Sequence, residues 1–595
     1  MNRNNEINEA LREFSSGDKE TAYKKLKIIF DKNKENDQLR FNLAVIQQSL
    51  NLNEDAIENY KFLIKKNKNT KAMINLYLLY IKQESFGEAI KIISNLIKIL
   101  GQLDNLVKDK AFVLFKQKKY KASILICKKY LEINHKDVNI LNILGLNFFG
   151  LRDNVQAEKI LKHALSIDKN NFFVLNSLGR IYHDLRDSIN AEKYLLAAYK
   201  LENNSYEIIN NLAGFYREEE QYQKAINFYN KALKINPTNP SIINNLAKVY
   251  FDIEELSLAE EFCFKALKID KNNENIKKII SLIYFRKKDY KNAWFYFDGR
   301  LNLSDFVEKN KSIVKIRNKL FVKNKIHKQL KLLVLREQGV GDEILYGTMY
   351  KDLLNLCDNV TIECDKRLKN IFQKTFKKHK NNFIDLGLVS NNQKKIEKYD
   401  HVIYAGSLGK FFRQSSKNFN DGNYLNADTY LVSNWNDRLK KLKNKFNIGV
   451  SWKSFKNRYS REKSLELNDF NKILNNKKFN FINMQYGDVR EEIKKYNEET
   501  ENKIISFNDL DLFNNFDQIA ALLKNLDLFI SVSNSTAHLA GSLGVKTLLI
   551  KPPKHAVFHY WNQSDHKTPW YKSIDLIEKE NLKEGSKLLS KYFDL

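Results

Sequence analysis

The chain is poor in cysteine, and no cysteine pattern of a disulfide framework or a zinc site runs through it. The four cysteines lie far apart or without partner spacing: Cys127, Cys263, Cys357 and Cys364. This spacing excludes a disulfide-rich secreted domain and a zinc module. We therefore expect a reduced, intracellular compartment.

The sequence also lacks the pattern of a signal peptide or a membrane span. The N-terminal residues MNRNNEINEALREF contain no apolar core. The most apolar window, Leu526 to Ile550, is interrupted by Asn534 and His538, which indicates a strand and a helix instead of a span. We expect no transmembrane segment and a cytoplasmic location, with peripheral attachment to the inner membrane left open.

Acidic residues are outnumbered, with 71 Asp and Glu against 100 Lys and Arg and a net charge of +29. Binding to nucleic acid would require this charge to be clustered. The lysines are instead spread along the chain among Asn and Glu, and aromatic and basic residues do not alternate at a regular spacing. We expect no nucleic-acid partner.

A repeat fills the first half of the chain, and 595 residues are too many for one hydrophobic core. Pairs of small residues twelve apart recur every thirty-four residues: Ala10/Ala22, Ala44/Ala56, Gly145/Ala157, Gly179/Ala191, Ala213/Ala225 and Ala247/Ala259. Two further pairs have lost one small residue and a third slips by one position: Tyr77/Ala89, Ser281/Ala293 and Lys110/Ala122. Nine units result.

Each unit has the pattern of two amphipathic helices. The segment NNLAGFYREEEQYQKAINFYNKALKINP resembles the tetratricopeptide repeat, with Pro237 ending the second helix. The resemblance implies an α-solenoid whose concave face binds a protein or peptide. Asparagines on the first helices are candidates to bind a peptide backbone: Asn176, Asn210, Asn211, Asn244 and Asn245. A spacer role for the array stays open.

From Lys331 the period changes to short apolar runs that alternate with helical stretches. The predicted strands are 331–337, 360–365, 382–387 and 400–407, then 446–452, 479–486, 503–508, 526–533 and 545–551. Alternation of this kind predicts parallel sheets, and the two series predict two Rossmann-like lobes with a ligand at the carboxyl ends of the strands. The expected domains are a repeat array at 1–305, a linker at 306–330, and lobes at 331–440 and 441–595.

Polar segments follow these strands. The stretch LVLREQGVGDEIL runs from a strand through Gly339 and Gly341 into an acidic helix start. In the second lobe a basic loop with Lys456, Arg458, Arg461 and Lys463 follows Lys453. The run SNSTAHLAG supplies helix N-cap residues, and a helix N-terminus can hold a diphosphate.

The motifs REQGVGDEIL, ECDKRL, GVSWKS, MQYGD and SNSTAHLAGSLG together resemble bacterial tetratricopeptide-containing glycosyltransferase-like proteins, whose C-terminal part is similar to the heptosyltransferases of lipopolysaccharide synthesis. The resemblance covers roughly residues 331–575. It implies a B-type glycosyltransferase fold (GT-B). It also implies an enzyme that transfers a hexosyl, heptosyl or N-acetylhexosaminyl group from a nucleotide sugar with inversion at the anomeric carbon. It implies no metal and no cofactor besides that co-substrate.

The resemblance assigns roles to individual residues. Asp342 falls where these enzymes have their general base, on an acceptor-side turn formed by Glu337, Gln338, Gly339 and Gly341. The donor and nucleotide side comprises Lys453, Arg461, Lys463, Gln485, Tyr486, Asn534, Ser535, Thr536 and His538. Ser533 stands where many relatives have Asp, which puts the donor identity in doubt.

Alternative interpretations stay open for some of these residues. Asp342 is also suited to starting a helix, His538 to a place in the core, and the basic loop to a solvated surface. Two functions follow. One is a glycosyltransferase that acts on a protein or glycan acceptor recruited by the repeats. The other is a non-catalytic interaction scaffold with a degenerate transferase-like domain.

Overall fold

The computed structural model describes residues 3–310, 316–321, 326–442, 446–455, 463–552, 558–561 and 566–593. The chain divides into two compact units, Met1–Pro237 and Thr238–Leu595, and each is described by itself.

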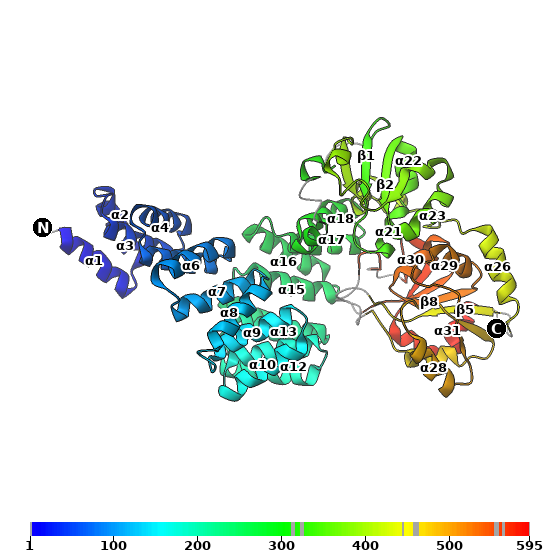
Figure 1. The fold of residues 1–595 in the computed structure, drawn as a ribbon, viewed down its shortest axis with the longest axis horizontal. Coiled ribbons are helices and arrows are strands. Elements are labelled where there is room, and N and C mark those ends of the chain that lie inside the picture. Colours follow the sequence, from blue (N-terminus) through cyan, green and yellow to red (C-terminus); the bar gives the residue numbers. More distant parts are fainter. Residues whose placement is uncertain are drawn as a thin grey trace. The chain divides into compact units, whose positions relative to one another are not determined.

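The first unit is a series of helical hairpins (Figure 1). Its helices are α1 Arg3–Ser16, α2 Lys19–Asp31, α3 Asp37–Ser49, α4 Asn53–Asn67, α5 Thr70–Lys82, α6 Phe86–Leu100, α7 Asp104–Lys116, α8 Tyr120–Leu131, α9 Val138–Gly150, α10 Asn154–Ile167, α11 Phe172–Asp184, α12 Ser188–Leu201, α13 Tyr206–Glu218 and α14 Tyr222–Ile235. The first helices of successive hairpins contact one another, as α9, α11 and α13 do, and so form the inner layer.

A left-handed residue joins the two helices of each hairpin. In the first unit these residues are Gly17, Asn51, Glu84, Lys118, Arg152, Arg186 and Glu220, all with positive φ. They are spaced by thirty-four residues except from Asn51 to Glu84, where one residue is missing. The backbone therefore follows the period that the small residues predict.

The missing residue corrects one predicted pair. Because the shortening lies before Glu84, the small pair of the fourth hairpin is Ala111/Ser123 and not Lys110/Ala122. Ala111 and Ser123 are buried, and the Ser123 hydroxyl donates to the Ala111 carbonyl at 2.7 Å.

Close helix packing explains the glycines of the repeat. A Cβ at Gly145 would lie 2.6 Å from Leu161 Cγ, and one at Gly179 would lie 2.6 Å from Leu195 Cγ. Two helices can approach this closely only where a side chain is absent.

We expect Gly179→Ala to destabilise the array by about 1–3 kcal/mol, because the new methyl overpacks against Leu195. Gly214→Ala is the matched control, since its Cβ would meet only Tyr229 Oη at 3.6 Å. Alanine there improves helix propensity by up to about 1 kcal/mol. Urea-induced loss of helical circular dichroism measures both changes, and equal midpoints for the two variants would contradict the packing argument.

The second unit begins with two more hairpins and continues into sheets. Its helices are α15 Pro240–Asp252, α16 Leu256–Ile269, α17 Glu274–Arg286, α18 Tyr290–Phe297, α19 Ser304–Lys309, α21 Val340–Gly347, α22 Tyr350–Leu356, α23 Lys366–Thr375, α24 Gln393–Ile396, α25 Gly409–Phe412, α26 Thr429–Leu439, α27 Asn471–Leu474, α28 Arg490–Glu499, α29 Phe516–Leu523, α30 Ser535–Ser542 and α31 Ser586–Ser590. A 3-10 helix, η1 Asp298–Asn302, follows α18.

The first sheet has four parallel strands in the order β3-β2-β1-β4. Its strands are β1 Lys331–Leu335, β2 Asn359–Cys364, β3 Phe383–Asp385 and β4 His401–Tyr404. In this register Val334 pairs with Ile362 and Ile403. The predicted fourth strand, 400–407, is too long, because the Gly406 N–H donates to Glu337 and residues Ala405–Leu408 form a 3-10 helix.

The second sheet has seven strands in the order β10-β11-β9-β8-β5-β6-β7. They are β5 Phe446–Ser451, β6 Phe479–Asn483, β7 Ile504–Ile505, β8 Leu528–Val532, β9 Thr547–Ile550, β10 Lys567–Thr568 and β11 Tyr571–Ile577. All neighbours are parallel except β10 and β11. From β7 to β11 the order is that of a doubly wound sheet.

The prediction of parallel sheets is confirmed, whereas β10 and β11 were not predicted. One hydrophobic core joins the last hairpin to both sheets. The same buried cluster contains Trp294 of α18, the paired residues Val334 and Ile403 of the first sheet, and Ala537 of α30. The last hairpin, by its packing, therefore belongs with the sheets.

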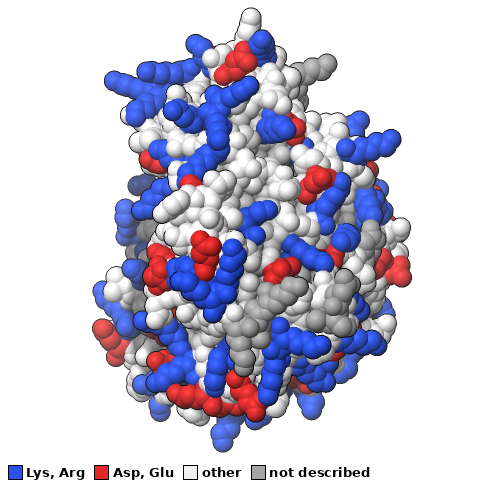
Figure 2. All heavy atoms as spheres, turned by 90° about the vertical axis from the view of Figure 1, so that its right-hand side faces the viewer, with Lys and Arg blue, Asp and Glu red and all other residues white. Residues whose placement is uncertain are grey.

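The surface of the second unit carries mixed charge. On the face shown in Figure 2, Lys and Arg lie among Asp and Glu over the whole visible area instead of gathering in one basic patch. In the part of the chain that the structure describes, every helix is too short or too polar to span a bilayer.

Candidate functional site

The site lies where the strand order of each sheet reverses. In the first sheet this switch point is between β1 and β4, and in the second it is between β5 and β8. In open α/β sheets a ligand usually binds in the crevice at such a switch point. The turn with Glu337 follows β1, and the N-cap run beginning at Ser533 follows β8.

The N-termini of α21 and α30 pack against each other. A Cβ at Gly341 would lie 2.9 Å from His538 Cδ2 and 3.3 Å from Ser535 Cα. The two predicted segments, far apart in the sequence, are therefore in direct contact, and Gly341 is required for that contact.

The Asp342 carboxylate accepts two hydrogen bonds and has a raised pKa. Its Oδ2 accepts from the Gly339 N–H at 3.0 Å, and its Oδ1 accepts from the Tyr560 hydroxyl at 3.4 Å. Burial raises the pKa of Asp342 to about 6, with a further rise from Glu337 against lowering by the Gly339 N–H and Lys463. Asp342 therefore fits the predicted helix-start role, and its carboxyl also has a pKa raised to about 6.

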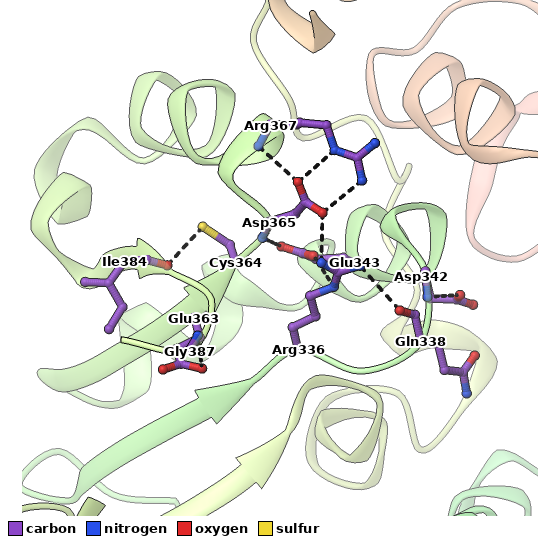
Figure 3. Close-up of polar contacts among 11 residues, drawn as sticks. Arg336, Gln338, Asp342, Glu343, Glu363, Cys364, Asp365, Arg367, Ile384 and Gly387 are labelled. Carbon is purple, nitrogen blue, oxygen red and sulfur yellow. Dashed lines mark hydrogen bonds and ion pairs between the residues drawn. The ribbon is translucent and has the colours of Figure 1, made fainter. Parts of the chain in front are cut away.

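Figure 3 separates Asp342 from its neighbour Glu343. Glu343 points toward Arg336 and the Asp365 backbone, while Asp342 lies on the other side of the turn. Burial raises the pKa of Glu343 to about 8, against the opposing charge of Arg336.

Asp365 behaves in the opposite way. Burial alone would raise its pKa, but hydrogen bonds from Arg367 and the charge of Arg336 lower the pKa of Asp365 to about 2. The distances are 2.8 Å from Arg336 Nη1 and 2.8 Å from Arg367 Nε. This carboxylate anchors the arginines behind the turn.

His538 lies in an aromatic box. Its Nδ1 is 3.2 Å from the Tyr571 hydroxyl, and its ring stacks on Trp561 with 4.9 Å between centroids. Burial lowers the pKa of His538 to about 3, helped by Lys463. The imidazole is therefore neutral and supplies no positive charge.

Asn534 caps α30 and ties it to β5. Its Oδ1 accepts from the Ala537 N–H at 3.1 Å, and its Nδ2 donates to Ser451 Oγ at 2.8 Å. Ser535 and Thr536 follow as the first helical residues. The free N–H groups of this helix end favour an anion.

Gln485 and Tyr486 stabilise the loop after β5. Gln485 Oε1 accepts from the Trp452 N–H at 2.8 Å and the Lys453 N–H at 2.6 Å, and its Nε2 donates to the Tyr486 carbonyl at 2.7 Å. The Tyr486 ring contacts Phe455. Ser451 Oγ also donates to Gln485 Oε1, at 3.0 Å, so a hydrogen-bond chain links Gln485 to Asn534.

Of the predicted basic residues, the structure describes Lys453 and Lys463. Lys463 is buried, with Nζ 3.8 Å from the Phe558 ring centroid. Lys453 Nζ is 2.7 Å from Glu492 Oε2 on α28, so its charge is already paired. Arg461, Lys456 and Arg458 lie outside the described residues.

In the predicted acceptor-side turn, Glu337 is buried and already paired. Glu337 is only 2% exposed, and its two oxygens accept from Arg300 Nε and Nη2 at 2.7 Å each. It therefore holds the turn in place through Arg300.

Gln338 is exposed and has a φ of 59°, and its carbonyl accepts from Arg336. A left-handed conformation costs a residue with a side chain about 1 kcal/mol. Such strain clusters at functional sites.

Sequence reasoning missed the aromatic residues and Arg300. Tyr560, Trp561 and Tyr571 surround His538, and Tyr560 reaches Asp342. The run FHYW at 558–561 was a usable signal, because three aromatic rings and a histidine in succession are unusual on a surface.

Two further findings bear on ligands. Within the described ranges, His, Cys, Asp and Glu form no group of three or more that could hold a metal ion. A shallow cavity of about 320 Å³ lies in the first unit and is lined by Lys118, Lys119, Tyr120, Lys121, Ala122 and Leu151, none of them a predicted site residue.

Comparisons with known proteins support the repeat assignment. Family models described as "Tetratricopeptide repeat" and "TPR repeat" match residues 174–205 and 215–253. The chain therefore carries tetratricopeptide repeats, as predicted.

Among curated proteins, Protein FlbA of Caulobacter vibrioides is 29% identical over 260 residues, which are 41% of this chain and 42% of FlbA. The match thus spans less than half of that relative.

Two solved structures are similar in part. A tetratricopeptide repeat protein from Parabacteroides merdae is 15% identical with a TM-score of 0.39, covering 42% of this chain and 98% of its own. PilF of Pseudomonas aeruginosa is 18% identical with a TM-score of 0.29, covering 33% of this chain and 91% of its own.

The contact at Gly341 can be tested by substitution. We expect Gly341→Ala to lower the thermal midpoint of the second unit, because overpacking of about 1–3 kcal/mol arises against His538 and the Ser535 backbone. Gly339→Ala is the control, since its nearest contact is Asp342 Oδ2 at an ordinary 3.4 Å. Differential scanning calorimetry of the full chain would contradict the contact if the two variants melted alike.

Proposed function

We propose that the second unit is a metal-independent, inverting glycosyltransferase of the GT-B type. It transfers a sugar from a nucleoside-diphosphate donor to a protein or glycan acceptor. The observation that supports this proposal best is the contact between the turn of Asp342 and the N-terminus of α30. A carboxyl that titrates near pH 6 lies beside a helix end suited to a diphosphate.

The chemistry follows from these two groups. The acceptor oxygen attacks the anomeric carbon, the bond from that carbon to the diphosphate oxygen breaks, and the acceptor proton passes to Asp342. The nucleoside diphosphate leaves with the bonding electron pair. The N–H groups at Ser535 and Thr536, with Lys463, would stabilise its charge.

The roles of the other predicted residues are narrower. His538 is neutral, so in this proposal it shapes the donor pocket without adding charge. Gln485 and Tyr486 position the loop after β5, which would contact the nucleotide. Arg461 retains its proposed role beside the leaving group.

The repeats indicate protein–protein interaction. We propose that the inner layer of the array recruits the acceptor polypeptide. Asn211 Nδ2 donates to Asn176 Oδ1 at 3.0 Å and so joins two hairpins, while Asn142 Oδ1 is buried without a hydrogen-bond partner among the described residues. Asn244 Oδ1, in the second unit, is likewise unpartnered within the described part. Amide groups of this kind can bind an extended backbone through both donor and acceptor.

The rival is a non-catalytic scaffold, in which the sheets only support protein binding. The extensive engagement of Glu337, Gln485 and Lys453 by their neighbours favours it. Catalytic activity distinguishes the two proposals, because a scaffold neither transfers nor hydrolyses a nucleotide sugar.

We expect Asp342→Asn to reduce sugar transfer by about 10²–10⁴-fold while donor affinity stays within about twofold of wild type. Asparagine can still accept from the Gly339 N–H, so the turn is retained. The measurement is transfer from a panel of radiolabelled nucleotide sugars, with titration calorimetry for the donor. Asp358→Asn, an exposed site in the same lobe, is the control, and an active Asp342→Asn would exclude the base.

The activity should depend on pH through Asp342. Its deprotonated form is the base, so kcat/KM should fall about tenfold per pH unit below about 6 and level off above it. A pH profile from 5 to 8 tests this prediction. A profile that is flat through this range would rule out a base with that pKa.

A further inference from the structure

Arg300, from the end of the repeat series, fills the switch point of the first sheet. Its guanidinium is buried, with Nη1 2.9 Å from Asp298 Oδ1 and Nη2 3.0 Å from Ser407 Oγ. Together with the paired bonds to Glu337, these contacts bind Arg300 to the loops after both β1 and β4.

This arrangement leaves no room for a ligand in the first crevice. A Cβ at Gly406 would lie 2.5 Å from Glu337 Oε1 and 2.9 Å from Arg300 Nη2. The Gly406 N–H, which would otherwise be available to a bound anion, donates to Glu337 at 2.6 Å. The first switch point is thus closed by the chain itself.

The last hairpin also packs on the segment of the second lobe that reaches Asp342. Phe285 stacks on His559 with 4.9 Å between ring centroids, and His559 precedes Tyr560, which donates to Asp342. Trp294 Nε1 donates to the Arg413 carbonyl at 2.9 Å. The end of the repeats is therefore linked to the turn of Asp342 by two routes. One runs from Arg300 to Glu337. The other runs from Phe285 to His559 and on to Tyr560 in the second lobe.

The charges around Asp342 make one of these connections electrostatic. Glu337 is the anion on the same turn, and Lys463 is the cation from the second lobe. The other titratable groups that face it are Tyr346, one helical turn along α21, and Tyr560 and Tyr571 from the second lobe; His538, which packs against Gly341 of the same turn, is neutral. Arg300 neutralises Glu337, so it governs how much negative potential reaches Asp342.

We propose that Arg300 is a positioning residue that couples the last hairpin to the candidate site by holding Glu337 and compensating its charge beside Asp342. The coupling deepens the proposed transferase function and depends on it for its catalytic meaning. It makes the last hairpin a functional part of the site and not a spacer.

The test compares three variants of the full chain: Arg300→Gln, Glu337→Gln and the double variant. Loss of Arg300 leaves Glu337 uncompensated, so the acid limb of the kcat/KM profile should move to higher pH by about one unit. Loss of Glu337 removes an anion, so the limb should move to lower pH. The double variant should return close to wild type, because both charges are gone.

A merely structural role predicts a different pattern. Arg413→Gln removes another buried arginine, which binds Asp352 at 2.7 Å and the Thr348 carbonyl at 2.9 Å. It should lower stability while leaving the acid limb in place. Unmoved limbs in Arg300→Gln and Glu337→Gln, or shifts of the same sign in both, would overturn the proposal. If Arg300→Gln does not fold, Glu337→Gln and the double variant still decide it.

A second measurement separates this inference from the proposed function. The Asp342 carboxyl can be titrated without substrate by 13C NMR of aspartate-labelled protein, assigned by difference from Asp342→Asn. Opposite shifts in the two single variants support the coupling even if no sugar is transferred. Absence of transfer by wild type refutes the transferase alone, whereas unchanged Asp342 titration refutes the coupling alone.

Discussion

The contact between Gly341 and His538 is the constraint on which the site depends. It brings the N-terminus of α21 within van der Waals distance of the N-terminus of α30, and no residue with a side chain fits at Gly341 without displacement. Helix α21 follows β1 and α30 follows β8, and each of these strands borders the switch point of its sheet. This one contact therefore brings the two switch points together. The turn of Asp342 and the anion-favouring end of α30 then face the same place.

Burial gives the charged groups at this contact distinct states. Asp342 titrates near pH 6, Glu343 near pH 8, and His538 stays neutral, although all three lie within two neighbouring helices. Such divergence of acids in one site is typical of catalytic constellations, and it also arises in structural ion-pair networks. The proposed assignment rests on geometry as well, because only Asp342 of the two acids points away from the arginines (Figure 3).

The local parts of this picture were predictable from the sequence. The glycine turn at Gly339 and Gly341 and the N-cap run at Asn534 have short-range signatures, so their elements were correctly placed. The partners of Glu337 and Gln485 were not predictable, because Arg300 lies 37 residues away and the loop after β5 lies 33 residues away. Such pairings are set by tertiary packing. The strands β10 and β11 were missed for a related reason, since β10 has only two residues and pairs with β11 through a bulge.

The most direct test of the account is a crystal structure of the full chain soaked with nucleoside diphosphates in metal-free buffer. The account predicts a diphosphate within hydrogen-bond distance of the N–H groups at Ser535 and Thr536, with its terminal phosphate directed toward Asp342. A diphosphate bound elsewhere, or none at saturating concentration, would contradict it.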